Sequence, residues 1–192
     1  RQNTLLQMGY MFRKHDGFER ITAWARSGFL GHIFQVRAHM STWIPEQNPE
    51  GIFTGREGLA HHEGGVMYDL GGHVLDQVVW ILGRPSRVTG FLQHATSETP
   101  GVMDNTLGVF EYDNAIATVD ITAMEPRPMA RRFEVYGTKG SAIMEPFEPA
   151  DTVRLVLEND QGEYKKGVNT IKIEDRPRYV GTFAEFVRNI RG

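Results

Sequence analysis

Residues 106–122 read TLGVFEYDNAIATVDIT and contain two short runs rich in β-branched and aromatic residues. Between the runs, Asp113-Asn114 is typical of a tight turn. The second run alternates, with Ala117, Val119 and Ile121 on one side, and a period of two indicates a strand with one buried face. Because strands joined by so short a turn run antiparallel, the stretch predicts a hairpin within an antiparallel sheet.

Similar runs occur through the rest of the chain, separated by turn signals such as Gly137-Thr138-Lys139-Gly140. Each run is short enough to be a single strand. The further candidate strands are Leu5 to Phe12, Ile33 to Met40, Val88 to His94, Arg132 to Tyr136, Ser141 to Met144, Thr152 to Leu157 and Thr170 to Ile173. Tight turns between most of them predict a largely antiparallel sheet.

Three segments carry the helical period instead. The first begins at Asp16-Gly17-Phe18-Glu19, which reads as a capping box, and stops at Gly28. The second is Gly65 to Leu82, and the third, Tyr179 to Ile190, is expected to turn Phe183 and Ile190 inward. The predicted fold is α+β, a largely antiparallel, open-faced β-sheet with helices packed on one face.

Composition excludes several classes of function. The 192 residues are 40% hydrophobic, which is enough for the core of one domain. Lys and Arg total 21 against 24 Asp and Glu, so the chain has no basic surface for nucleic acid. It lacks cysteine, which fits a reducing compartment, and lacks an apolar stretch long enough to cross a membrane. We expect a cytoplasmic domain without nucleic-acid or membrane partners.

The glycines are plentiful but are never separated by a single residue. No Gly-x-Gly and no Gly-Lys-Ser/Thr occurs among the 21 glycines. Since these patterns let a backbone approach phosphate groups, the chain carries no dinucleotide fingerprint and no phosphate loop. We therefore assign no cofactor-binding residue to it.

The second helix combines polar side chains in one stripe. The stripe consists of Asp69, His73, Asp76 and Trp80, at spacings of 4, 3 and 4. Gly71 and Gly72 lie beside it, although glycine costs about 1 kcal/mol relative to alanine inside a helix. One interpretation is a solvated helix face. The other is a proton-transfer pair, with Asp69 orienting His73 as the general acid/base.

The same region could be interpreted as a metal site. The cluster holds His61, His62, Glu63, Asp69 and His73. However, Val66 stands where His-Glu-x-x-His would need its second histidine, so the zinc motif is absent. We assign no metal, and a metal-dependent lyase or isomerase using this cluster is an alternative function.

The stretch Gly65 to Asp76, followed by Trp80-Ile81-Leu82-Gly83, resembles the Gly-Gly-x-x-x-Asp-x-Gly-x-His-x-x-Asp…Leu-x-Gly segment of the Gfo/Idh/MocA oxidoreductases. These are glucose–fructose oxidoreductase, inositol dehydrogenase and their relatives. Three other stretches agree in order and spacing, Gly9 to Arg13, Ser27 to Gly31 and Tyr136 to Ala142. The resemblance covers almost the whole chain.

The resemblance implies that residues 1–192 form a C-terminal substrate-binding and oligomerisation domain. It implies a separate N-terminal Rossmann domain, absent from this sequence, that binds NAD or NADP and carries a Glu-Lys-Pro lysine. Asp69 and His73 would be the substrate-side catalytic pair for hydride transfer on a sugar, cyclitol or related polyol. The open sheet face would form a homo-oligomer. The chain departs from the family pattern at Glu63 and at Lys14 to Gly17.

Four residues are candidates for substrate binding. Arg13 would lie near the domain junction, by the resemblance. Trp43 and His62 sit in the long loop that leads to the second helix and could line a polyol pocket, although the favoured alternative for Trp43 is a packing anchor. Asp76 belongs to the polar stripe. The remaining alternative is a non-catalytic sugar-binding or assembly module that keeps these residues without redox chemistry.

Overall fold

A computed structural model describes residues 4–43, 62–95 and 101–191. Its α-helices are α1 (Asp16–Arg26), α2 (Gly72–Leu82) and α3 (Val180–Arg191), with a 3₁₀ turn η1 (Met11–Lys14) and a π-helical turn η3 (Met67–Gly71). The strands are β1 (Ile33–Ser41), β2 (Arg87–Gln93), β3 (Asn105–Tyr112), β4 (Ala115–Thr122), β5 (Arg132–Gly137), β6 (Gly140–Met144), β7 (Thr152–Leu157) and β8 (Gly167–Lys172). No helix in this part of the chain is long and apolar enough to cross a membrane.

The strands form one sheet in the order β2-β3-β4-β1-β5-β6-β7-β8. The predicted hairpin is confirmed as β3 and β4, in which Tyr112 lies opposite Ala115. Every neighbouring pair is antiparallel except β1 and β4, which run parallel. β1 therefore lies between two antiparallel groups, β2-β3-β4 and β5-β6-β7-β8, that both follow it in the chain. The α+β class with a mostly antiparallel sheet is confirmed.

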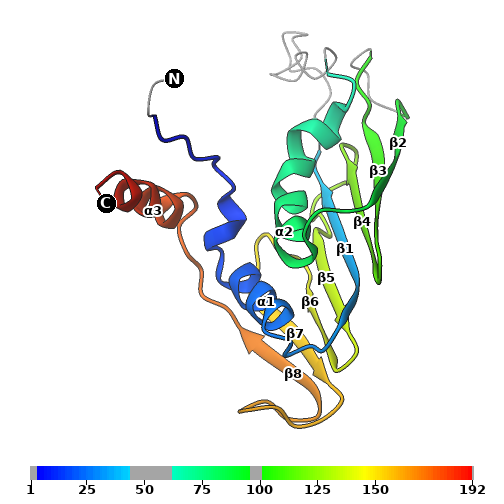
Figure 1. Cartoon of the computed structure of the whole chain (residues 1–192). Coiled ribbons are helices and arrows are strands. Elements are labelled where there is room, and N and C mark those ends of the chain that lie inside the picture. Colours follow the sequence, from blue (N-terminus) through cyan, green and yellow to red (C-terminus); the bar gives the residue numbers. More distant parts are fainter. Residues whose placement is uncertain (1–3, 44–61, 96–100, 192) are drawn as a thin grey trace.

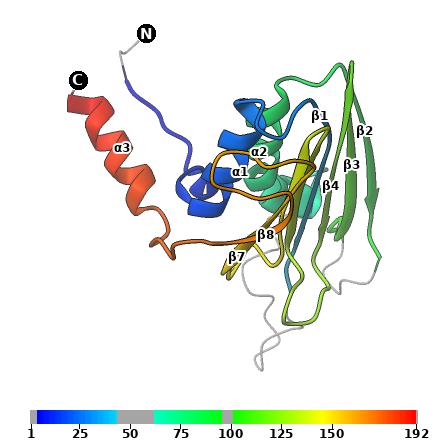
Figure 2. The same cartoon turned by 90° about the horizontal axis from the view of Figure 1, so that it is seen from below.

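The core lies between the sheet and two helices. Figures 1 and 2 show α1 and α2 against the same face of the sheet. The residues buried on that face alternate along the central strands, as in Val36, Ala38 and Met40 of β1. On the other face Ile116 is 50% exposed, and no helix of the described residues covers it.

The strand predicted at Leu5 to Phe12 is wrong. Residues 4–10 have no regular secondary structure, and the 3₁₀ turn η1 follows them. A strand needs a neighbour for its backbone N–H and C=O groups. In the described part of the chain no strand lies alongside this segment, and the Gln7 side-chain amide donates to the Thr182 carbonyl at 3.0 Å instead.

The helix predicted at Asp16 is confirmed as α1, but the capping box is wrong. His15 is the N-cap and makes no side-chain cap hydrogen bond. The Asp16 carboxylate instead accepts from the Glu174 backbone N–H at 2.9 Å and from Arg176 Nη2 at 3.0 Å. Asp16 therefore ties α1 to the segment after β8, because a buried carboxylate must find donors wherever the fold supplies them.

The closing helix is confirmed as α3, but its apolar side is not turned into the core. Phe183 is 66% and Ile190 60% exposed. Figure 1 shows α3 standing away from the sheet, beside the N-terminal segment. An ion pair between Lys14 and Glu185 at 3.4 Å joins it to η1. Helical periodicity identifies an apolar stripe but not the element that covers it.

Substituting Phe18→Ala tests the core. Phe18 is fully buried, and removing its ring should lower the free energy of unfolding by about 3–5 kcal/mol. Urea denaturation followed by circular dichroism measures the change. The matched control is Phe91→Ala, because Phe91 is 55% exposed on β2 and should lose far less. Equal losses for the two variants would contradict this description of the core.

Candidate active site

The helix predicted over residues 65–82 is confirmed, and it is interrupted by the π-helical turn η3. Gly65 has φ +49°, and a Cβ there would lie 2.2 Å from the Met103 carbonyl oxygen. A Cβ on Gly71 would lie 2.5 Å from Met67 Sδ. A Cβ at Gly65 would therefore collide with the Met103 backbone where the helix begins. A Cβ at Gly71 would collide with the Met67 side chain, so glycine suits both positions. Such π turns inside helices occur frequently at functional sites.

His73 lies in the first turn of α2, directly after η3. Its ring meets the buried Phe12 edge-on at 6.0 Å between centroids. Its Nδ1 is buried and has no hydrogen-bond partner among the described residues. Burial lowers the pKa of His73, against the opposing charges of Asp69 and Asp76. The imidazole is therefore neutral near pH 7, the form that can accept a proton.

Asp69 is exposed and belongs to η3. Its negative charge opposes the effect of burial on the pKa of His73. The structure therefore brings the two predicted catalytic residues close together. Asp69 lies within the π turn and His73 two residues beyond it, so the turn alters the regular spacing of four. Their catalytic roles stay predictions.

Arg13 and Asp76, both predicted to bind substrate, bind each other. Arg13 Nε and Nη2 donate to the two carboxylate oxygens of Asp76 at 2.8 and 2.6 Å. The Asp76 side chain is only 6% exposed, and the Arg13 guanidinium also lies over the Trp80 ring at 5.2 Å. This fork joins η1 to α2 and holds the helix that carries His73.

The other predicted residues lie at the ends of the undescribed segment 44–61. Trp43, 41% exposed, forms an isolated bridge with Met124. His62 is exposed and stacks on Tyr68 with ring centroids 4.1 Å apart. His61 lies outside the described residues. Among the residues that the structure does describe, no three His, Asp or Glu side chains converge as a metal site, so the alternative metal cluster gains no support there.

A polar network on the face opposite the helices was not predicted as a unit. His39 hydrogen-bonds through Nδ1 to Asp120, and its Nε2 lies 3.1 Å from Glu125 Oε2. Ser41 Oγ donates to the same Glu125 carboxylate. The hydrogen bond to Asp120 raises the pKa of His39 and outweighs burial. No local signal predicts this network, because the parallel pairing of β1 and β4 brings its members together.

Residues 18–143 match the family model described as the GFO/IDH/MocA C-terminal domain. The chain belongs to the GFO/IDH/MocA family. This agrees with the motif around Asp69 and His73, which lies inside the matched region. No curated protein matches the chain.

Solved structures share the fold of this GFO/IDH/MocA domain. An oxidoreductase from Thermotoga maritima has a TM-score of 0.75 at 20% identity, over 98% of this chain and 52% of that one. The Bacillus subtilis protein yvaA has a TM-score of 0.74 at 20% identity, over 97% of this chain and 56% of that one. Levoglucosan dehydrogenase, in complex with NADH and levoglucosan, has a TM-score of 0.68 at 19% identity, over 85% and 46%. The chain thus spans about half the length of these proteins.

Substituting Asp76→Asn tests the fork that supports α2. Loss of the buried charge weakens both hydrogen bonds from Arg13, and the free energy of unfolding should fall by about 1–3 kcal/mol. Chemical denaturation measures the loss. Glu111→Gln is the matched control, because its pair with Arg87 is exposed at the sheet edge and should cost at most about 1 kcal/mol. An equal cost for both variants would remove the structural role of the fork.

The His39 network should make stability depend on pH. Because the folded pKa of His39 is raised, protonated His39 stabilises the fold fully below its unfolded pKa of about 6.5. This stabilisation is lost as the pH rises through the folded pKa. The melting temperature of the wild-type chain should exceed that of His39→Gln most below about pH 6.5, and the difference should shrink above it. A pH-independent difference would contradict this assignment.

Proposed function

We propose that this chain is the substrate-binding domain of an NAD- or NADP-dependent oxidoreductase that acts on a sugar, cyclitol or related polyol. In the complete enzyme a hydride passes between a substrate carbon and the nicotinamide. His73 is the proposed acid/base and Asp69 its assisting carboxylate. The observation that carries the proposal is the neutral, half-buried imidazole of His73 beside Asp69, with Nδ1 buried and unpartnered among the described residues.

The chemistry asked of His73 is the movement of one proton. When a substrate carbinol is oxidised, its O–H proton would pass to the neutral imidazole of His73. The hydride from its C–H bond would be accepted by the nicotinamide on the separate domain, so that a carbonyl and an imidazolium form. The carboxylates of Asp69 and Asp76 favour the imidazolium that forms, because their charges raise the pKa of His73. The reverse step returns the proton to the alkoxide as the carbonyl is reduced.

The residues of this chain do not fit the cofactor itself. A pyrophosphate needs open backbone N–H groups at a helix N-terminus. The first turn of α1 instead carries Asp16 and Glu19, and the sequence has no Gly-x-Gly. We therefore place the cofactor on a separate domain of the complete enzyme, where the nicotinamide would supply the hydride acceptor. The neighbour bound to NADH and levoglucosan supports a nicotinamide cofactor and a sugar-like substrate.

Arg13, Trp43, His62 and Asp76 stay the proposed substrate contacts. Trp43 and His62 would present rings to the apolar face of a sugar. Arg13 uses Nε and Nη2 for Asp76, so a substrate hydroxyl would meet its Nη1. Asp76 would act on the substrate through the orientation that it gives to Arg13.

The sheet face opposite α1 and α2 is the proposed site of homo-oligomer formation. Phe91 and Ile116 are 55% and 50% exposed on strands at one end of that face. A second copy of the chain would remove this apolar surface from water.

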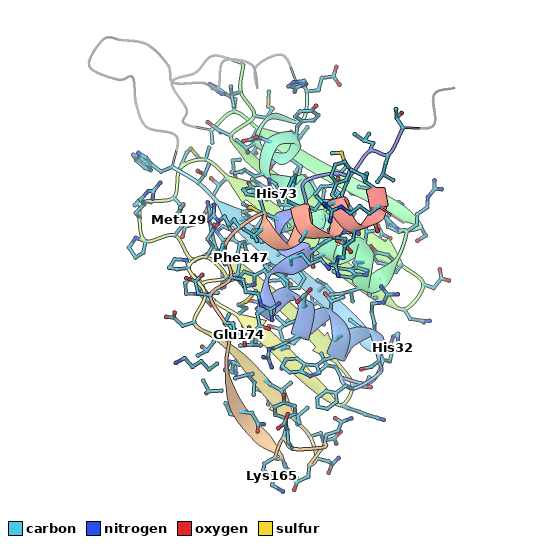
Figure 3. All side chains as sticks on the ribbon, turned by 90° about the vertical axis from the view of Figure 1, so that its left-hand side faces the viewer. His32, His73, Met129, Phe147, Lys165 and Glu174 are labelled. Atoms are coloured by element: carbon cyan, nitrogen blue, oxygen red, sulfur yellow. The ribbon has the colours of Figure 1, made fainter. Side chains whose placement is uncertain are left out.

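Substituting His73→Ala in the complete enzyme tests the proposal. Loss of the acid/base should lower kcat by about a hundred- to ten-thousand-fold while cofactor binding persists. The control is His32→Ala, because His32 lies at the far end of the molecule and bonds the Asn114 carbonyl (Figure 3). Turnover that survives in His73→Ala would favour the non-catalytic sugar-binding or assembly module.

A further inference from the structure

A hollow of about 630 Å³ opens beside η1, on the side where Figure 3 labels Met129, Phe147 and Glu174. It is lined by η1 and His15, the loop 127–131, the loop 147–151 and the segment 174–179. His73 is not part of its lining. Phe12 lines the hollow and touches His73, so one aromatic ring separates the two places.

One wall of the hollow is lined by Arg127, Arg131 and Arg178 and by the carboxylate of Glu148. Arg131 and Arg178 both form ion pairs with Glu148, and Arg127 makes no ion pair within the described part of the chain. The Arg131 side chain is only 12% exposed, and its Nε donates to the Ser41 carbonyl at 3.0 Å. Three guanidinium groups and one ion-paired carboxylate therefore face this part of the hollow.

Arg127 and Arg178 lie close enough to Arg131 for their positive charges to repel it. Burial, and then the positive charges of Arg178 and Arg127, lower the pKa of Arg131, against the opposing charge of Glu125. Nearby like charges of this kind are costly unless an anion joins them. Arginine forks match the planar geometry of carboxylate and phosphate groups.

With Lys14, Arg176 and the carboxylates of Asp151, Glu174 and Asp175 included, the lining holds five cations and four carboxylates, an excess of one positive charge. Arg176 is bound to Asp16, Glu19 and Glu174, so the carboxylate of Glu174 is already paired. Asp151 and Asp175 also line the hollow. The charge of Asp175 acts on His15, and neither aspartate is among the groups that shift Arg131.

Two further observations mark the hollow as more than a packing gap. His15 lines it, and its Nδ1 is buried without a hydrogen-bond partner among the described residues. Arg131 and Tyr179, also in the lining, have φ of 28° and 66°, in the left-handed region that residues other than glycine rarely adopt. Backbone strain of this kind clusters at ligand-binding sites.

We propose that this hollow binds the anionic group of a small molecule, a carboxylate or a phosphate, between Arg127, Arg131 and Arg178. The proposal does not depend on the oxidoreductase function, because it concerns binding alone.

Calorimetric titration of the full chain tests this site with two probes, inorganic phosphate and malonate. The double variant Arg127→Gln, Arg178→Gln removes two exposed guanidinium groups and leaves the more buried Arg131 in place. Its affinity for the bound probe should fall at least about tenfold, since charge-assisted hydrogen bonds are lost. Arg87→Gln is the matched control, because Arg87 is exposed at the far edge of the sheet and should leave affinity unchanged.

Binding of phosphate alone would assign a phosphorylated ligand, and binding of malonate alone a carboxylated one. Either result, lost in the double variant and kept in Arg87→Gln, supports the site. Absence of saturable binding for both probes would overturn the proposal. Equal affinity in the wild-type chain and a double variant with an unchanged melting temperature would also overturn it.

Discussion

The packing of the Phe18 ring against three other aromatic rings is the contact on which the rest of this domain depends. Its ring lies 4.7 Å from Phe12, 4.9 Å from Phe133 and 5.4 Å from Phe147, between centroids. These four residues come from η1, α1, β5 and the loop after β6. Aromatic rings bury large apolar areas, so this cluster joins four separate elements at one point. Phe12 then touches His73, and Phe12 and Phe147 line the arginine-rich hollow.

Around this apolar centre, buried carboxylates connect elements that are not neighbouring strands of the sheet. Asp16 ties α1 to the segment after β8, and Asp76 ties α2 to η1. Each carboxylate is almost fully buried and receives an arginine, which is the arrangement that makes burial of a charge tolerable. The proposed acid/base His73 therefore lies on a helix that Asp76 ties to η1, whereas the arginines of the hollow lie on loops.

Several predictions from sequence were wrong for one shared reason. Leu5 to Phe12 has the composition of a strand, but the described chain offers it no neighbour. Asp16 has the spacing of a capping box, but Glu174 and Arg176 supply better donors from the other end of the chain. In α3 the apolar stripe exists, yet no described element covers Phe183 or Ile190. A local sequence pattern shows which structure or contact a segment can form. The tertiary neighbours of that segment decide whether the structure or contact forms.

Local periodicity alone determined the strands β1 to β8, the helices and the stripe that includes Asp69 and His73, because alternation and helical spacing depend only on nearby residues. The absence of Gly-x-Gly is likewise read from the sequence alone. Only the tertiary structure decided the parallel pairing of β1 with β4, and with it the contact between His39 and Asp120. It also decided that Arg13 binds Asp76 and that Arg127, Arg131 and Arg178 meet in one hollow. Contacts between residues so far apart in the chain follow from how whole elements pack, which no local period encodes.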